Sequence, residues 1–211
     1  MWIGKETDMW KKYRVIIQIR ERIVGGIPKS TKLIEGWLKS RRMADLVEQT
    51  AKEMGDQLDE TIKGTWTGFK SDKTGLYLEA RCVKALLKEA ANVIRKLIKF
   101  KGFMRARVAE RVMVNPSRIY LGVKKPTGNE ERPIQVWAGG RPQSAFKRFD
   151  YVERPALQFD LWLLDDGVIT EKHLCQLLEY GQQAGLGANR SQGEGKFDVV
   201  EFGLLERDSA K

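Results

Sequence analysis

A row of cations at helical spacing between Arg81 and Lys99 is the chemical pattern that stands out in this chain. At 3.6 residues per turn, the row falls on one stripe about 60° wide, and the opposite face of the segment is apolar. Such a helix lies on a core and holds charges of one sign outward, which predicts contact with a polyanion. The alternative is a solvated charged face, but Glu79 and Glu89 fall off the stripe, so we favour a ligand. The candidate residues of the stripe are Arg81, Lys84, Lys88, Asn92, Arg95 and Lys99.

A glycine-rich segment at residues 185–195 is a second candidate for anion binding. Glycine permits positive φ and close approach of backbone N–H groups, so such a segment can hold phosphates. It lacks the ending of a Walker A loop, and its order of helix before strand is the reverse of a dinucleotide-binding fingerprint. The alternative is that the glycines only form a helix C-cap and a tight turn. The candidate residues are Gly185, Gly187, Asn189, Arg190, Ser191, Gly193, Gly195 and Lys196.

Two aromatic residues that precede the cationic segment, Trp66 and Phe69, are candidates for stacking on bases. Glycine, threonine and lysine flank them, so we expect both side chains to be exposed. Trp137 and Tyr151 are the next candidates. Core packing is expected instead for three aromatics that fall in regular apolar patterns, namely Trp37, Phe159 and Trp162.

Groups suited to catalysis or metal binding are few. His173 is the only histidine, and metal-independent cleavage of RNA would need it as an acid or base. Asp165 and Asp166 stand beside a glycine where a turn explains them, and neighbours on an extended chain point to opposite sides. Cys82 and Cys175 are isolated, which predicts two reduced thiols and no zinc site. We therefore expect no catalytic residue, no metal and no cofactor.

The elements that must position these residues follow from periodicity and turn residues. Strands are expected at 13–20, 107–114, 117–123, 132–137, 145–151, 157–163 and 197–204. Helical spacing also covers two pieces of residues 30–59, and Thr170 is expected to cap a helix that runs to about residue 183.

This order of elements predicts an α+β fold, with helices over one face of an antiparallel sheet. We expect a ferredoxin-like (RRM-like) βαββαβ core in a single domain, residues 1–211. A helical and loop insertion is expected at 28–76, and a β-rich insertion with an extra antiparallel hairpin at 106–153. A chain of 211 residues can bury such a core without disulfides or metal.

The net charge of +10 is unevenly distributed. Residues 70–111 hold twelve Lys or Arg against four Asp or Glu, which is typical of a nucleic-acid footprint. No apolar run approaches the roughly 20 residues of a membrane-spanning helix, and the first residues do not resemble a signal peptide. We expect a cytoplasmic protein without membrane contact.

Two motifs and the order of elements carry a resemblance to a known family. Residues 185–195 read Gly-Leu-Gly-Ala-Asn-Arg-Ser-Gln-Gly-Glu-Gly, which resembles the Gly-x-Gly-x-x-Arg-Ser-x-Gly-x-Gly signature of the RAMP superfamily of CRISPR-associated RNA-binding proteins. Residues 78–90 resemble the first-helix motif of the effector backbone subunits of that superfamily. The resemblance implies an RRM-like domain that grips a guide RNA along its phosphates. Its motif positions here are Arg81, Lys84, Lys88, Gly185, Gly187, Arg190, Ser191, Gly193, Gly195 and Lys196.

The sequence therefore predicts a non-catalytic protein that binds single-stranded, guide-type RNA and assembles with other subunits or with further copies of itself. One alternative is a structural or assembly protein of a virus or mobile element, whose basic helix contacts a protein partner. A third interpretation is a metal-independent endoribonuclease that uses His173.

Overall fold

The computed structural model describes residues 9–29, 66–138 and 141–205. The helices expected within residues 30–59, with Trp37, and most of the insertion expected at 28–76 lie outside the described residues. The described part contains both helices and antiparallel strands, so the α+β class is confirmed.

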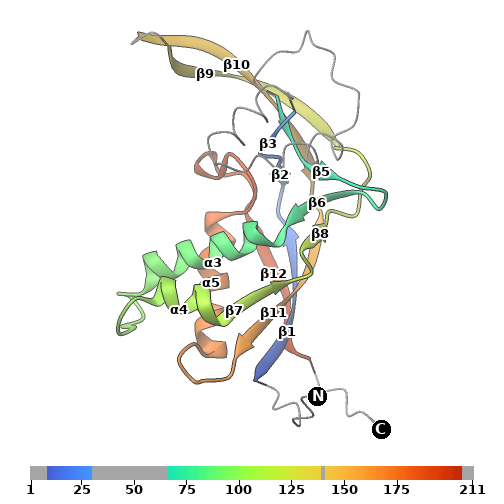
Figure 1. The fold of residues 1–211 in the computed structure, drawn as a ribbon. Coiled ribbons are helices and arrows are strands. Elements are labelled where there is room, and N and C mark those ends of the chain that lie inside the picture. The colour runs from blue at the N-terminus through green and yellow to red at the C-terminus, as the bar shows by residue number, and fades with distance from the viewer. Residues whose placement is uncertain (1–8, 30–65, 139–140, 206–211) are drawn as a thin grey trace, which may run out of the picture.

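A four-stranded sheet forms the centre of the molecule (Figure 1). Its strands are β1 (Trp10–Ile19), β7 (Val112–Asn115), β11 (Ala156–Leu164) and β12 (Phe197–Leu204). They lie in the order β12-β1-β11-β7, and every neighbouring pair is antiparallel. Apolar residues alternate with polar ones along β1 and β11, because only one face of the sheet is buried.

Helices α3 (Ala80–Ile94) and α5 (Glu171–Ala184) cover the buried face (Figure 1). Leu86 and Leu87 of α3 and Leu174 and Leu177 of α5 join the apolar side chains of β1 and β11 in one core. Thr170 precedes α5 as expected, and it forms a reciprocal capping box with His173.

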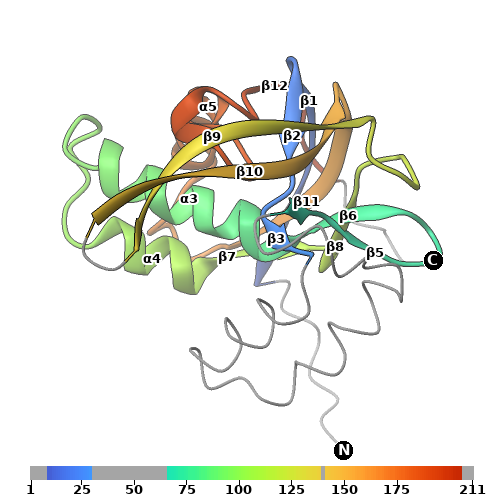
Figure 2. The same cartoon turned by 90° about the horizontal axis from the view of Figure 1, so that it is seen from above.

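A second group of strands extends from one end of the central sheet. Strands β9 (Gly128–Ala138) and β10 (Arg141–Glu153) form a long antiparallel hairpin that leans over the side on which the helices lie (Figures 1 and 2). The short strands β2 (Arg22–Val24), β3 (Ile27–Pro28) and β4 (Thr67–Gly68) complete that sheet. A third sheet consists of β5 (Lys70–Ser71), β6 (Leu76–Glu79) and β8 (Arg118–Tyr120).

The strand expected at 107–114 is largely wrong. Helix α4 (Met104–Arg111) occupies most of that segment, and the strand begins only at Val112. Alternating arginines gave an apparent period of two. The decisive pair is Met104 and Val108, which are one helical turn apart and both fully buried. Helix α4 packs directly on α3.

Helix α3 is shorter than expected, because it ends at Ile94 rather than at Lys99. Turns continue the chain to Lys99, which has a φ of 54°, and the N–H of Phe100 donates to the carbonyl of Arg95 at 2.9 Å. The cationic row therefore continues past the helix over irregular backbone.

Candidate functional site

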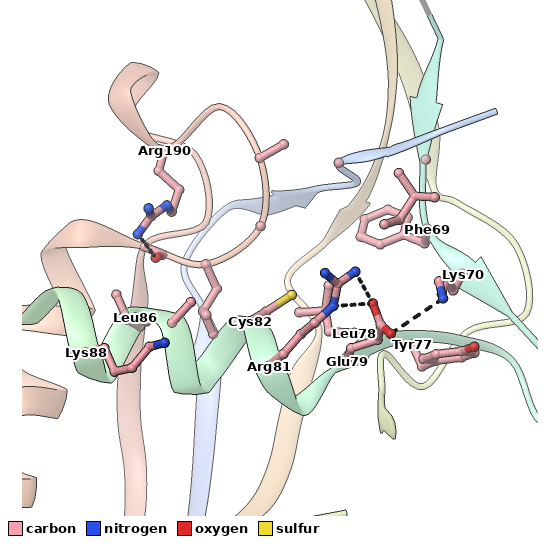
Figure 3. A pocket seen from close by; sticks show the side chains of 18 residues that line it. Phe69, Lys70, Tyr77, Leu78, Glu79, Arg81, Cys82, Leu86, Lys88 and Arg190 are labelled. Carbon is pink, nitrogen blue, oxygen red and sulfur yellow. Dashed lines mark hydrogen bonds and ion pairs between the residues drawn. The ribbon is translucent and has the colours of Figure 1, made fainter. Parts of the chain in front are cut away.

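Helix α3 and the glycine loop, residues 185–195, meet at a pocket of about 590 Å³ (Figure 3). Its other walls come from β3, the segment containing β4 and β5, and β6. The pocket brings together residues from two motifs that lie about 100 positions apart in the sequence. Six of the predicted site residues line it: Phe69, Arg81, Lys88, Gly185, Gly187 and Arg190.

Tight backbone packing explains three glycines of the glycine loop. Gly185 is the C-cap of α5 with a φ of 77°, and a Cβ there would lie 2.6 Å from the carbonyl oxygen of Glu194. A Cβ at Gly187 would lie 2.6 Å from the carbonyl oxygen of Val24, and a Cβ at Gly195 would collide with a neighbouring backbone carbonyl. The C-cap and tight turn that formed the alternative interpretation are thus present.

Several N–H groups of the glycine loop are engaged within the protein. Leu186 donates to Gly195, Ala188 to Val24, and Gly195 to the carbonyl of Arg22, all at 2.9–3.0 Å. The amides of Ala188 and Gly195 hold the loop against β2, and the amide of Leu186 joins the two ends of the loop. The charged side chains around the loop are therefore better placed to meet an anion than these amides are.

A buried carboxylate, Glu194, fastens the glycine loop to two strands. Its side chain is 8% exposed and accepts two hydrogen bonds from Arg22 of β2, at 3.0 and 2.8 Å. Arg132 of β9 donates to the same carboxylate at 3.1 Å, and Glu130 bridges both arginines at 2.5–2.6 Å. Because the arginines come from different strands, this cluster fixes the position of the loop.

Most cations at the pocket are already paired with carboxylates. Arg81 donates to Glu79 at 2.5–2.7 Å, and Lys70 lies 3.5 Å from the same carboxylate (Figure 3). Arg190 donates through Nη2 to Glu89 at 2.8 Å, which ties the glycine loop to α3. Lys88, by contrast, has no hydrogen bond or ion pair to any described residue.

Lys84 corrects the expectation of an unbroken outward row. Its ammonium turns toward α4 and donates to the carbonyl oxygens of Val108, at 3.1 Å, and Val112. Those carbonyls lie at the C-terminal end of α4, where a lysine interacts favourably with the carbonyl oxygens of the last turn. Burial, and next the charge of Lys88, lower the pKa of Lys84 to about 8. Helical periodicity alone did not reveal this, because α4 was expected to be a strand.

The stability of the fold should depend on pH through Lys84. Between its folded pKa of about 8 and its ordinary value of 10.5, the unfolded chain binds a proton that the folded chain does not. The free energy of unfolding therefore rises with pH in this window. We expect the wild type to gain about 2 kcal/mol relative to Lys84→Met between pH 7.5 and pH 10, a value reduced for partial exposure. Urea unfolding at both pH values measures it, and parallel curves for the two proteins would contradict it.

The remaining residues of the row lie beyond the pocket. Asn92 and Lys99 are exposed and Arg95 is half-buried. They lead into a basic tip, residues 95–107, which contains six cations and no Asp or Glu. Among its cations, only Arg107 has an ion pair with a described residue, Glu110 at 3.5 Å. The six cations are Arg95, Lys96, Lys99, Lys101, Arg105 and Arg107.

Five further predicted residues of the glycine loop and its end do not line the pocket. Asn189 is half-buried in the left-handed conformation, whereas Ser191 and Gly193 are exposed. Lys196 is half-buried and leads into β12. The fifth residue, Gly195, is buried.

The expected exposure of the two aromatic candidates is wrong for Phe69, which is 6% exposed and lines the pocket. Trp66 is half-buried, and its Nε1 donates to Asp150 at 2.7 Å. Lys29 and Arg148 place cations 4.0 and 4.8 Å from the centroid of the Trp66 ring. Trp66 and Phe69 flank the two-residue strand β4, and tertiary packing turns both aromatics inward, which the flanking glycines did not indicate.

The other aromatic residues follow the expectation in part. Phe159 is buried in the core as predicted. Trp162 is half-buried on the opposite side of the strand, with Lys12 4.6 Å from its ring centroid. Tyr151 is half-buried and contacts Arg22 at 4.9 Å, whereas the side chain of Trp137 lies outside the described set.

The groups considered for catalysis have structural partners. His173 Nδ1 accepts from the N–H of Thr170 at 3.1 Å, and burial lowers the pKa of His173. Asp165 pairs with Lys11 at 2.8 Å and Asp166 with Arg111 at 2.6 Å. Both cysteines are free thiols. Within the described residues there is no cluster of metal-ligating side chains, and no helix is long and apolar enough to span a membrane.

A solved structure shares this fold. It is a chain in the cryo-EM structure of the Type III-B Cmr-beta bound to cognate target RNA, similar with a TM-score of 0.53 and 15% identity. The similarity covers 95% of this chain but only 62% of that chain. No protein-family model and no curated protein matches the sequence. At this level of identity, the likeness concerns the fold.

Sequence reasoning missed the carboxylates of the site. Glu79 and Glu89 fall off the cationic stripe, yet each pairs with a predicted cation. Their positions beside the stripe were visible, but their partners depend on how the glycine loop packs on α3. Glu194 was also missed, although its place between two glycines marks it as the one acidic side chain of the loop.

Proposed function

We propose that this protein binds single-stranded RNA along its phosphates. The observation that carries the proposal is the row of cations from Lys88, at the pocket, to the basic tip, in which only Arg107 has an ion pair with a described residue. An RNA strand that lies along α3 meets Lys88 first, then Arg95 and Lys99, and releases counterions at each. Arg81 and Arg190 stand beside this path and contribute once a phosphate competes with their carboxylates.

The topology supports an RNA-binding framework of the ferredoxin-like (RRM-like) type. The elements β1-α3-β7-β11-α5-β12 follow one another along the chain, and their sheet order places β1 and β11 at the centre. We infer that they form the βαββαβ core. The segment between β7 and β11, with the β9–β10 hairpin, is then an insertion into that core.

The similarity to a chain of an RNA-bound Type III-B structure, together with the RAMP-like glycine signature, supports a guide-type RNA as the ligand. We propose a role as a subunit of a ribonucleoprotein, with other proteins or further copies of this chain as partners. We assign it no catalytic step, because His173, Asp165 and Asp166 are engaged in a cap and in ion pairs.

Binding of a fluorescent single-stranded RNA, measured by anisotropy across salt concentrations, tests the proposal. We expect Lys88→Gln to weaken binding about fivefold, or about 1 kcal/mol, because one unpaired cation on the path is removed. Lys125→Gln removes an equal charge from an exposed loop away from α3 and serves as the control. Equal affinities for the two variants, or an affinity that does not change with salt, would refute the proposal.

A further inference from the structure

The pocket beside α3 is more than a place for phosphate, because its floor is apolar. Phe69, Leu78, Leu86 and Leu186 line it and are all less than 9% exposed. Its volume of about 590 Å³ falls within the ~300–1,000 Å³ range of small-molecule sites. A phosphate is fully hydrated in water and gains nothing from apolar walls. A flat, largely apolar group suits this floor better.

Helix α3 contributes two cations to the pocket lining, Arg81 and Lys88. Arg81 and Lys88 lie two turns apart on α3, about 10 Å along the axis. The residues of α3 that line the pocket between them are uncharged: Cys82, Ala85 and Leu86. Figure 3 shows the sulfur of Cys82 pointing into the space between Arg81 and the glycine loop. An anionic chain that touches both cations along the pocket passes across this uncharged stretch.

We propose that the pocket receives one unstacked base of the bound strand, while the phosphates on either side of that base lie on Arg81 and Lys88. This inference rests on the proposed RNA binding. The base would pack against Phe69, Leu86 and Leu186, and burial of its faces supplies affinity that does not depend on salt. Glu79, held by Arg81 and Lys70, places a hydrogen-bond acceptor at the wall for the edge of the base.

Cys82 provides a reporter for the floor of the pocket. The chain has two cysteines, and Cys175 is exposed on α5, so Cys175→Ser leaves Cys82 as the one thiol. Burial raises the pKa of Cys82, so the alkylation rate with iodoacetamide is measured at pH 8.5 by mass spectrometry. The probes are a 12-nucleotide oligoadenylate and an abasic oligomer of the same length and charge.

We expect saturating oligoadenylate to slow alkylation of Cys82 at least tenfold, and the abasic oligomer to bind with a similar salt dependence but change the rate less than twofold. Ala85→Trp, which fills the pocket from an exposed position on α3, should weaken oligoadenylate binding to the level of the abasic oligomer. Oligoadenylate that binds without protecting Cys82 would overturn the base site and leave RNA binding standing. Equal protection by both oligomers would also overturn it. Absence of binding by either probe would refute the proposed function itself.

Discussion

Replacing Glu194 with alanine is expected to lower the free energy of unfolding by about 3 kcal/mol and to release the glycine loop from the sheet. The side chain is 8% exposed and is shared by Arg22 and Arg132. Its removal leaves two partly buried guanidinium groups with one carboxylate, Glu130, between them. The value lies at the low end for a broken buried pair, because both arginines keep that partner and some solvent.

Urea unfolding followed by circular dichroism measures this loss, and Glu179→Ala is a matched control. Glu179 is exposed on α5 and has no ion pair with a described residue, so its removal should change stability by less than 0.5 kcal/mol. A double-mutant cycle with Arg22→Ala separates the coupling from the general effect of truncation. Equal stability of Glu194→Ala and Glu179→Ala would show that the cluster does not hold the loop.

The loop's attachment matters for function because Arg190 reaches α3 only from a fixed loop. The hydrogen bonds that Arg22 donates to Glu194 are the largest influence that raises the pKa of Arg22, which agrees with a strongly bound pair. A released loop would carry Arg190 away from Glu89 and open the wall of the pocket beside Lys88. Glu194→Ala should therefore also weaken RNA binding, because the displaced loop no longer forms one wall of the pocket.

Local patterns predicted the elements whose own residues determine them. The alternation at 157–163 predicted β11, and Thr170 predicted the start of α5, since period and capping are properties of a few neighbouring residues. For residues 104–111 the local pattern gave the wrong element, a strand in place of most of α4. Their helix depends on the burial of Met104 and Val108 in the core that α4 shares with α3, a pattern that the arginines between them conceal.

The sequence predicted which residues form the candidate site, but it did not predict which of its cations have hydrogen-bond or ion-pair partners. The cationic row and the glycine loop were both visible, and the structure places Arg81, Lys88 and Arg190 around one pocket. Which cations remain unpaired depends on tertiary packing. Lys84 donates to the end of α4, and Arg190 pairs with Glu89. Neither interaction could be predicted from spacing along the chain.

The difference between paired and unpaired cations determines which side chains contribute most to the binding free energy of a polyanion. A cation that already holds a carboxylate gives up that contact when a phosphate arrives, so its net contribution is small. A free cation gains the full attraction and releases a counterion from the nucleic acid. The affinity should therefore reside mainly in Lys88 and the basic tip.

Reversing the charge of Lys88, Arg95 and Lys99 together is expected to reduce affinity for single-stranded RNA at least a hundredfold at 0.1 M salt. Each substitution by glutamate removes one phosphate contact and adds a repulsive charge, so the slope of log affinity against log salt should fall by about 2. None of the three side chains has a hydrogen bond or an ion pair with a described residue, so the thermal unfolding curve should move little.

The matched control is the triple reversal Lys73→Glu, Lys124→Glu and Lys125→Glu, which makes the same change in net charge on exposed loops away from α3. If affinity depended only on total charge, both triple variants would lose it equally, and the row would not be the binding surface. We expect the affinity of the control variant for RNA to fall less than threefold.

The tip region also exposes two apolar side chains, Leu97 at 82% and Phe103 at 79%, which are suited to a protein partner. Unchanged RNA binding, together with loss of oligomers in light scattering of nuclease-treated protein, would assign the basic tip to a protein partner.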